Sequence, residues 1–290
     1  MITTKSITKL KKLVKEAKKT GKTIGFVPTM GALHEGHLSL IDKAKKESSY
    51  LVVSIFINPL QFGPSEDFRR YPRDVKADKR MLKEKKVDLL FYPQADKIYN
   101  PDFSTFVEET KLSKKLCGKS RPGHFKGVTT IVTKLFNIVD PDLSYFGQKD
   151  YQQALIIKKI VKDLNFTVKI KVAPTIREKD RLALSSRNLY LSKKERKESK
   201  SIYQALLQAK QMIKNNEKDP KKIINQINKI IASNSTASID YIEIRDANNL
   251  KKIKKIKGRI FIGIAAYFGS PSGEAAGKTR LIDNIIVNKN

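Results

Sequence analysis

The sequence predicts an α/β protein in which a Rossmann-like, doubly wound parallel sheet (residues 1–176) is followed by a smaller α+β domain (residues 177–290). Three observations favour this fold. Short apolar runs alternate with helical periodicities between residues 24 and 172, as in right-handed β-α-β units. Several runs end in loops containing Gly, Pro or Asn, which would gather polar side chains at one edge of the sheet. Beyond residue 176, Lys-rich helices and a few alternating or apolar strands replace that pattern.

Hydrophobic periodicity predicts the elements of the large domain. An amphipathic helix carries Ile7, Leu10, Val14 and Ala17 on one face and ends at Gly21. The remaining elements of this part are expected, in order, as a strand at 24–27, a helix from 34–37 onward, a strand at 50–57, a helix at 75–86, strands at 87–92 and 103–107, a buried helix face at 128–139, a strand at 143–146, a helix through 155–164 and a strand at 167–172.

The small domain is predicted from capping signals and two apolar runs. Ser192 and Glu195 have the spacing of a capping box, so a helix is expected from there to about Ile213. Asp219 and Pro220 open another helix, and strands are expected at 239–245 and 259–267. Residues 269–277 are rich in Gly, Ser and Ala and are expected to form a surface loop.

The overall composition indicates a globular protein with a very polar surface. Of the 290 residues, 40% are hydrophobic, and the mean hydropathy is -0.43. No apolar run approaches the roughly 18 residues of a membrane span, and the N-terminus has no apolar signal core. The single cysteine, Cys117, excludes an internal disulfide and favours a reducing compartment. We therefore expect a cytoplasmic protein without a membrane partner.

The formal net charge of +30 raises the alternative of a nucleic-acid-binding protein. The excess is mostly lysine, it is spread over nearly every predicted helix, and it accompanies many Ile and Asn residues. All three residue types use A/T-rich codons, and basic residues are not interleaved with aromatic ones. We therefore interpret the charge as compositional bias, and we expect weak, salt-sensitive adhesion to polyanions but no specific nucleic-acid partner.

The strongest functional signal is the stretch Val-Pro-Thr-Met-Gly-Ala-Leu-His-Glu-Gly-His at 27–37. An apolar strand breaks at Pro28, and a helix begins near His34 to His37, so two of the three histidines lie at a helix N-terminus. Exposed N–H groups and the helix dipole favour a phosphate there. Two histidines in a turn could equally be solvated loop residues, but Gly36 would let a ligand come close between them.

Three further stretches have a functional interpretation beside a plain structural one. Lys149, after Gly147, could be a surface lysine or a counter-charge for phosphate at the sheet edge. The Leu-Ser-Ser-Arg-Asn run at 184–188 could be a polar turn or a set of donors for a polyphosphate. Asn58 and Gln61 could cap a loop or orient a small hydroxy acid. Taken singly, none of these stretches decides the function.

In this order and spacing, the stretches resemble the pantothenate synthetase (pantoate–β-alanine ligase) family, a branch of the His-x-Gly-His nucleotidyltransferase superfamily. The resemblance covers essentially the whole chain, and all three histidines fall within matching blocks. These blocks are residues 27–37, Asn-Pro-Leu-Gln-Phe at 58–62, Tyr-Pro-Arg at 71–73, Ser-Arg-Pro-Gly-His-Phe at 120–125, Phe-Gly-Gln-Lys-Asp at 146–150 with Gln152 and Gln153, and Leu-Ala-Leu-Ser-Ser-Arg-Asn at 182–188.

The resemblance implies an AMP-forming ligase of pantothenate biosynthesis. It would condense (R)-pantoate with β-alanine through a pantoyl adenylate, releasing pyrophosphate and AMP. His37, as proton donor, His34 and Lys149 would be catalytic, Gln61 and Gln153 would bind pantoate, and Gln61 would also bind β-alanine. The ATP contacts would be Met30, Gly31, Ala32, Leu33, His34, Glu35, Gly36, His37, Gly147, Gln148, Lys149, Asp150, Ile176, Leu184, Ser185, Ser186 and Arg187.

Family resemblance also bears on cofactors and partners. The sequence holds no cluster of metal ligands, so we expect no protein-held metal, and Mg²⁺ would arrive on the ATP phosphates. Family members are usually homodimers. Another adenylyltransferase of the superfamily, such as a tRNA-charging enzyme, is the main alternative, and the blocks around Gln61 and Gln153 argue against it. The chain departs from the family at Arg181, where a glycine is usual, and at the insertion 269–277.

Overall fold

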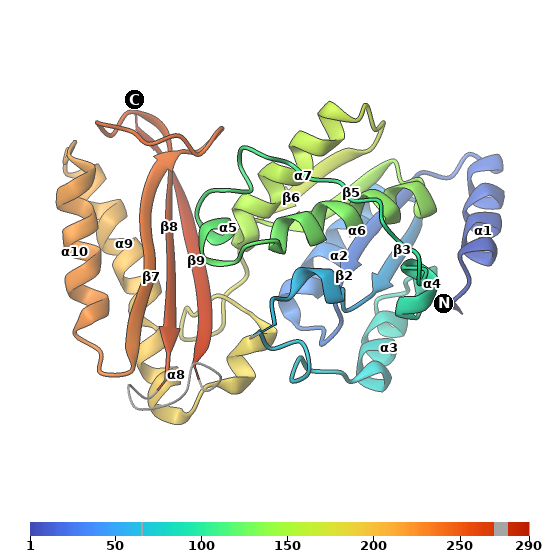
Figure 1. Cartoon of the computed structure of the whole chain (residues 1–290), viewed down its shortest axis with the longest axis horizontal. Helices are drawn as coiled ribbons and strands as arrows, with labels where there is room; N and C mark the ends of the chain where they lie inside the picture. The colour runs from blue at the N-terminus through green and yellow to red at the C-terminus, as the bar shows by residue number, and fades with distance from the viewer. Residues whose placement is uncertain (65, 270–277, 290) are drawn as a thin grey trace.

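The computed structural model describes residues 1–64, 66–269 and 278–289 (Figure 1). A six-stranded sheet in the order β1-β4-β3-β2-β5-β6 forms the large domain, and all of its strand pairs are parallel. The order reverses direction at β2, because β3 lies on one side of it and β5 on the other. Such a switch point is where open α/β sheets bind ligands. The strands are Ile2–Thr4 (β1), Ile24–Thr29 (β2), Tyr50–Ile55 (β3), Leu89–Phe91 (β4), Leu143–Gly147 (β5) and Lys169–Ala173 (β6).

Helices cover both faces of this sheet, as expected for a doubly wound fold. Phe26 faces the core formed with α1, α6 and α7, whereas the next residue, Val27, faces the core formed with α2 and α3. This alternation follows from the two-residue period of a strand. The helices are Ile7–Lys19 (α1), Glu35–Glu47 (α2), Val75–Glu84 (α3), Ala95–Ile98 (α4), Cys117–Ser120 (α5), His124–Val139 (α6) and Tyr151–Asp163 (α7), with short 3₁₀ turns at Pro59–Gln61 (η1) and Gln148–Asp150 (η2).

The small domain is an antiparallel sheet in the order β7-β8-β9 with helices on its outer face (Figure 1). Buried side chains of α9 and α10 pack on that outer face, whereas Phe261 of β8 stacks on Tyr151 of α7 with ring centroids 5.2 Å apart. The sheet therefore packs its inner face against the large domain. The elements are Ser186–Tyr190 (η3, a 3₁₀ turn), Lys193–Ser199 (α8), Ser201–Lys214 (α9), Pro220–Ala232 (α10), Ala237–Asp246 (β7), Gly258–Phe268 (β8) and Thr279–Lys289 (β9).

The predicted fold class is confirmed, but several elements differ from the prediction. The strand expected at 103–107 is wrong: Phe103 packs its ring on Tyr99, and the Val107 N–H donates to the Thr130 side chain, so no ladder forms. The helix expected from Ser192 to Ile213 is interrupted at Lys200. Strands β1 and β9 were not predicted from the sequence. Of the insertion expected at 269–277, residues 270–277 lie outside the described part of the chain.

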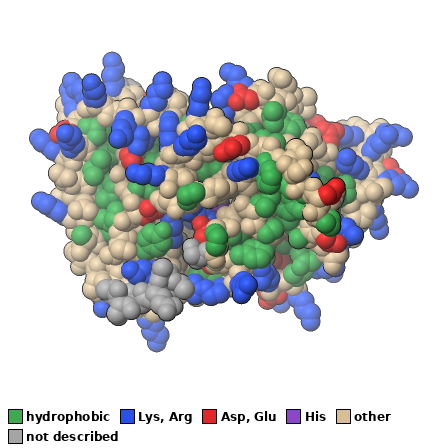
Figure 2. Space-filling model, in the orientation of Figure 1, with side chains coloured by type: hydrophobic (Ala, Val, Ile, Leu, Met, Phe, Trp, Pro, Cys, Tyr) green, Lys and Arg blue, Asp and Glu red, His purple; other side chains and the backbone are tan. Residues whose placement is uncertain are grey.

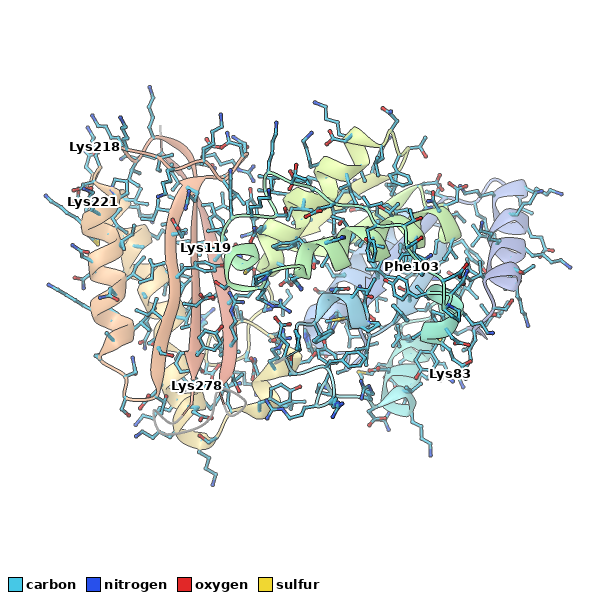
Figure 3. All side chains as sticks on the ribbon, in the orientation of Figure 1. Lys83, Phe103, Lys119, Lys218, Lys221 and Lys278 are labelled. Atoms are coloured by element: carbon cyan, nitrogen blue, oxygen red, sulfur yellow. The ribbon has the colours of Figure 1, made fainter. Side chains whose placement is uncertain are left out.

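The basic side chains are spread over the surface. On the face shown in Figure 2, lysine and arginine side chains surround the whole outline and form no single patch. Lys83 lies on the large domain and Lys218 on the small domain (Figure 3). This distribution agrees with compositional bias. Among the described residues, no helix is both long and apolar enough to cross a membrane.

Candidate active site

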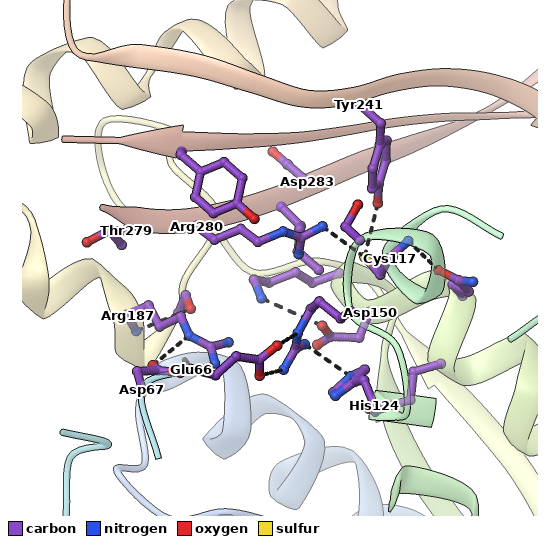
Figure 4. A pocket seen from close by; sticks show the side chains of 18 of the residues that line it. Glu66, Asp67, Cys117, His124, Asp150, Arg187, Tyr241, Thr279, Arg280 and Asp283 are labelled. Carbon is purple, nitrogen blue, oxygen red and sulfur yellow. Dashed lines mark hydrogen bonds and ion pairs between the residues drawn. The ribbon is translucent and has the colours of Figure 1, made fainter. Parts of the chain in front are cut away.

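Most of the site residues expected from the sequence line one cavity at the carboxyl ends of β2 and β5. This cavity has a volume of about 240 Å³, and a second one of about 430 Å³ adjoins it between the two domains (Figure 4). Lys149, Gln153 and Arg187 line both. The expected residues that line the smaller cavity are Met30, His34, Gly36, His37, Gln61, Gly147, Lys149, Asp150, Gln153, Ile176, Leu184, Ser185, Ser186 and Arg187.

Five of the expected ATP contacts do not line that cavity. Leu33 belongs to the hydrophobic core, and Glu35 is exposed in the first turn of α2. Gly31 and Ala32 shape the turn after β2, with backbone φ angles of 80° and 49°. The Gln148 carbonyl accepts a hydrogen bond from the small domain. Gly31 and Ala32 therefore contribute the shape of the turn rather than side chains in the smaller cavity.

The side chains of the two motif histidines form a capping box at the N-terminus of helix α2. The Gly36 N–H donates to His34 Nδ1 (3.1 Å), and the His34 N–H donates to His37 Nδ1 (3.4 Å). Their ring centroids are 4.1 Å apart. A neutral imidazole has one acceptor nitrogen and one N–H. Because both Nδ1 atoms accept, the hydrogen must be on Nε2 in each ring, so both histidines can donate a hydrogen bond without carrying a charge.

Burial keeps these imidazoles neutral. It lowers the pKa of His34 to about 4, helped by the Lys149 ammonium, and lowers the pKa of His37 to about 3, helped by His34 and Lys149. Burial and the Arg121 guanidinium likewise lower the pKa of His124 to about 3. The ordinary value is 6.5. At neutral pH the positive charge beside the motif is therefore that of Lys149.

These lowered pKa values predict that the folded protein loses stability in mild acid. Below about pH 6.5 the histidines of the unfolded chain would bind protons, whereas those of the folded chain would stay neutral. Unfolding therefore becomes more favourable as the pH falls. His37 and His124 should each contribute up to about 1.4 kcal/mol per pH unit. Thermal melts between about pH 7.5 and 5, above the range where most carboxylates titrate, would measure this. A melting temperature that stays constant over that range would contradict it.

Asp78 is a site residue that the sequence analysis missed. It lies on α3, is 2% exposed, and its carboxylate accepts the N–H groups of Ala32 (3.0 Å) and Leu33 (2.8 Å). These two bonds fix the turn between β2 and the His motif. The available signal was a carboxylate in register with Val75 and Leu82 on the otherwise apolar face of a Lys-rich helix.

Lys149 sits on the η2 turn directly after β5, and the small domain holds that turn. Asn284 of β9, which is 3% exposed, donates from Nδ2 to the carbonyls of Gln148 (3.0 Å) and Lys149 (2.8 Å). The Lys149 ammonium is 3.8 Å from the Asp150 carboxylate. Asn284 was also missed, because the contact joins residues more than 130 positions apart.

The Ser-Ser-Arg loop docks on the large domain. The Ser186 hydroxyl donates to the Ala32 carbonyl (3.1 Å), and Arg187 forms a two-pronged ion pair with Asp67 (2.8 and 2.7 Å). Upstream, Arg181 has φ 75°, the left-handed conformation that glycine adopts freely, and its N–H donates to the Glu178 carbonyl. Arg181 therefore occupies a backbone region that a glycine would enter without strain.

Gln61 lies on η1 and is held by residues of the 120–125 block. The His124 Nδ1 (2.8 Å) and the Arg121 guanidinium (3.2 Å) both contact the Gln61 carbonyl, and Arg121 is paired with Glu66 at 2.5 Å. Gln153, on the first turn of α7, lines both cavities. The two glutamines expected to bind the same substrate therefore face one cavity from different helices.

Comparisons with known proteins agree with this geometry. A family model described as "Pantoate-beta-alanine ligase" matches residues 2–286. The chain is 51% identical over 283 residues to the pantothenate synthetase of Fervidobacterium nodosum (98% of each chain) and 52% identical over 279 residues to that of Carboxydothermus hydrogenoformans (96% of each).

Solved structures give the same result. The crystal structure of pantothenate synthetase from Thermus thermophilus superposes with a TM-score of 0.90 at 39% identity, over 98% of this chain and 99% of that one. The pantoate-beta-alanine ligase of Francisella tularensis, complexed with "Beta-gamma ATP and Beta-alanine", has a TM-score of 0.80 at 37% identity, over 99% and 97%. The chain belongs to the pantoate–β-alanine ligase family.

Proposed function

We propose that this chain condenses (R)-pantoate with β-alanine to pantothenate, using ATP and forming a pantoyl adenylate. Family membership supports the reaction. The observation that carries the site assignment is the convergence of His34, His37, Lys149, Gln61 and Gln153 on one cavity at the switch point of the sheet. In that arrangement, groups suited to bind phosphate and groups suited to bind a hydroxy acid face a common volume.

In the first step a carboxylate oxygen of pantoate attacks the α-phosphorus of ATP, and pyrophosphate leaves. Negative charge builds on the oxygens of the pentacoordinate phosphorus. We assign the Nε2–H groups of His34 and His37, the Lys149 ammonium and the hydroxyls of Ser185 and Ser186 to stabilise that charge. With a pKa lowered to about 3, His37 would act as a neutral hydrogen-bond donor at physiological pH and not as the proton donor that the resemblance implies.

In the second step the amine of β-alanine attacks the acyl carbon of the adenylate. The C–N bond forms, the bond from carbon to the phosphate oxygen breaks, and AMP leaves with the electron pair while the amine loses a proton. AMP is a good leaving group, so less assistance from the protein is needed than in the first step. We assign Gln61 and Gln153 to hold the pantoyl part throughout.

The small domain would close the site. We propose a boundary near residue 176, with residues 1–176 binding nucleotide and pantoate and residues 177–290 acting as a lid. The contacts of Ser186 with Ala32 and of Arg187 with Asp67 support this role, because they join the loop at the start of the lid to the large domain. Closure would exclude water from an adenylate that water could hydrolyse.

The proposal extends to the cofactor, assembly and location of the protein. Mg²⁺ would enter with ATP, held chiefly by its phosphates, and would offset their charge. Among the described residues, no group of three or more His, Cys, Asp or Glu side chains is placed to hold a metal ion. We also propose a homodimer, testable by light scattering. A cytoplasmic location is consistent with an ATP-dependent biosynthetic reaction.

The function is tested by ATP–pyrophosphate exchange without β-alanine. We expect exchange that requires pantoate, since the adenylate forms and reverts before any amine is added. An amino acid in place of pantoate should support none, which separates this function from a tRNA-charging enzyme of the same superfamily. Exchange at the same rate with and without pantoate would overturn the proposal.

A further inference from the structure

The side-chain amide of Asn58 has a fixed orientation. Asn58 is fully buried at the start of η1. Its Oδ1 accepts the Leu60 N–H (3.3 Å), and its Nδ2 donates to the Gly127 carbonyl (3.0 Å). A backbone N–H can only donate and a backbone carbonyl can only accept, so these two partners determine which end of the amide is oxygen and which is nitrogen.

Tyr99 adds a third constraint on Asn58. Its hydroxyl lies 2.8 Å from Asn58 Oδ1, and because that oxygen can only accept, Tyr99 must donate. Burial raises the pKa of Tyr99 above its ordinary value, against a smaller lowering by Asn58, so the hydroxyl keeps its proton. The ring is held by Phe56 and Phe103, with centroids 6.1 and 4.9 Å away (Figure 3 labels Phe103). The donor is therefore fixed in position.

Asn58 is also hydrogen-bonded to Gln61, whose side chain lines the smaller cavity. Asn58 Nδ2 also donates to Gln61 Oε1 at 2.9 Å. This bond occupies the oxygen of the Gln61 amide. The Nε2 atom is the other end of that amide, and the Gln61 side chain lines the smaller cavity. An Nε2 group offers two N–H donors and no acceptor.

We infer that Tyr99 is a positioning residue for the substrate: through Asn58, it orients Gln61 so that the amide NH₂, and not the amide oxygen, faces the carboxylate or hydroxyl oxygen of pantoate. This inference rests on the proposed function, because it takes pantoate as the ligand of Gln61. Tyr99 lies outside the blocks that carry the family resemblance and does not itself line the smaller cavity; its hydroxyl acts on the cavity through Asn58 and Gln61.

Tyr99→Phe removes the hydroxyl and keeps the ring. In pantoate-dependent ATP–pyrophosphate exchange, the KM for pantoate should rise about 3- to 10-fold, the effect of one lost hydrogen bond, while the KM for ATP and kcat stay within about twofold. Tyr92→Phe is the matched control, because the Tyr92 ring lies 5.9 Å from the Lys5 ammonium and not on Asn58. It should leave all three constants unchanged.

A double-mutant cycle separates positioning from a general structural effect. In a Gln61→Ala background, Tyr99→Phe should no longer change the KM for pantoate, because the group on which Tyr99 acts is gone. An equal effect of Tyr99→Phe in both backgrounds would overturn the inference, as would no effect in either.

The orientation itself is tested by Gln61→Glu. A carboxylate can still accept from Asn58, but it presents an oxygen to the cavity where the amide presents NH₂. The KM for pantoate should therefore rise further in Gln61→Glu than in Gln61→Ala. A Gln61→Glu enzyme with near wild-type affinity would show that the oxygen end faces the substrate and would refute the relay. If the wild-type enzyme needs no pantoate at all, the proposed function itself fails, which is a different result from either of these.

Discussion

Replacing Lys149 with alanine should lower pantoate-dependent ATP–pyrophosphate exchange by about 10²- to 10³-fold, the usual cost of losing one donor to a developing negative charge. The loss should be large because the neighbouring imidazoles of His34 and His37 are neutral, so Lys149 supplies the charge beside the motif. The same variant, given preformed pantoyl adenylate and β-alanine, should form pantothenate at close to the wild-type rate, since the phosphoryl chemistry is already complete.

The matched control is Lys158→Ala, an exposed lysine on α7, which follows the η2 turn. It should leave both half-reactions unchanged. Circular dichroism of both variants would establish that they are folded. If the Lys149→Ala enzyme kept its ATP–pyrophosphate exchange but no longer converted the adenylate and β-alanine to pantothenate, the role assigned to Lys149 would be wrong.

Replacing Gly127 with alanine should strongly impair pantoate binding, because the added methyl group has no room beside η1. A Cβ at this position of α6 would lie 2.0 Å from the Leu60 carbonyl oxygen and 2.8 Å from the Gln61 nitrogen, and both are backbone atoms that cannot rotate away. The η1 turn must then move away from the helix by roughly 1 Å or more, and a displacement of that size can cost about 10²-fold in rate. The overpacking should also cost about 1–3 kcal/mol of unfolding free energy.

The measurement is kcat/KM for pantoate together with a thermal melt. Lys126→Ala is the neighbouring control, because its ammonium lies over the Phe106 ring, 4.2 Å from the centroid, and away from η1. It should bind pantoate normally. A Gly127→Ala enzyme with unchanged kcat/KM would mean that η1 tolerates displacement, and that the close contact does not set the position of Gln61.

Most strands of the large sheet, and the side chains that meet at its edge, could be predicted because the signals for them are local in the sequence. The apolar runs at 24–27 and 143–146 have the pattern of buried strands, and each is followed within a few residues by a turn that carries predicted site residues. Parallel strands then bring His37 and Lys149 to the same edge, although they lie more than 100 positions apart. Local pattern and one topological rule were sufficient for these residues.

The supporting residues could not be predicted in the same way. Asp78 and Asn284 each make two side-chain hydrogen bonds to loop backbone, and Tyr99 makes one to Asn58. Nothing in the flanking sequence of these residues specifies the partner. The false strand at 103–107 has a related cause. Its Phe residues have high strand propensity, but in the tertiary structure Phe103 packs on Tyr99 and Phe106 packs on Phe103.

The central claim, that pantoate is activated as an adenylate in this cavity, is tested most directly by isotope transfer. Pantoate labelled with ¹⁸O in its carboxylate is incubated with the enzyme, ATP, Mg²⁺ and β-alanine, and the products are analysed by mass spectrometry. Attack of the carboxylate on the α-phosphorus predicts one ¹⁸O atom in AMP and the other in the new amide of pantothenate. Label recovered in inorganic phosphate, with ADP as the nucleotide product, would indicate an acyl phosphate and would contradict the account.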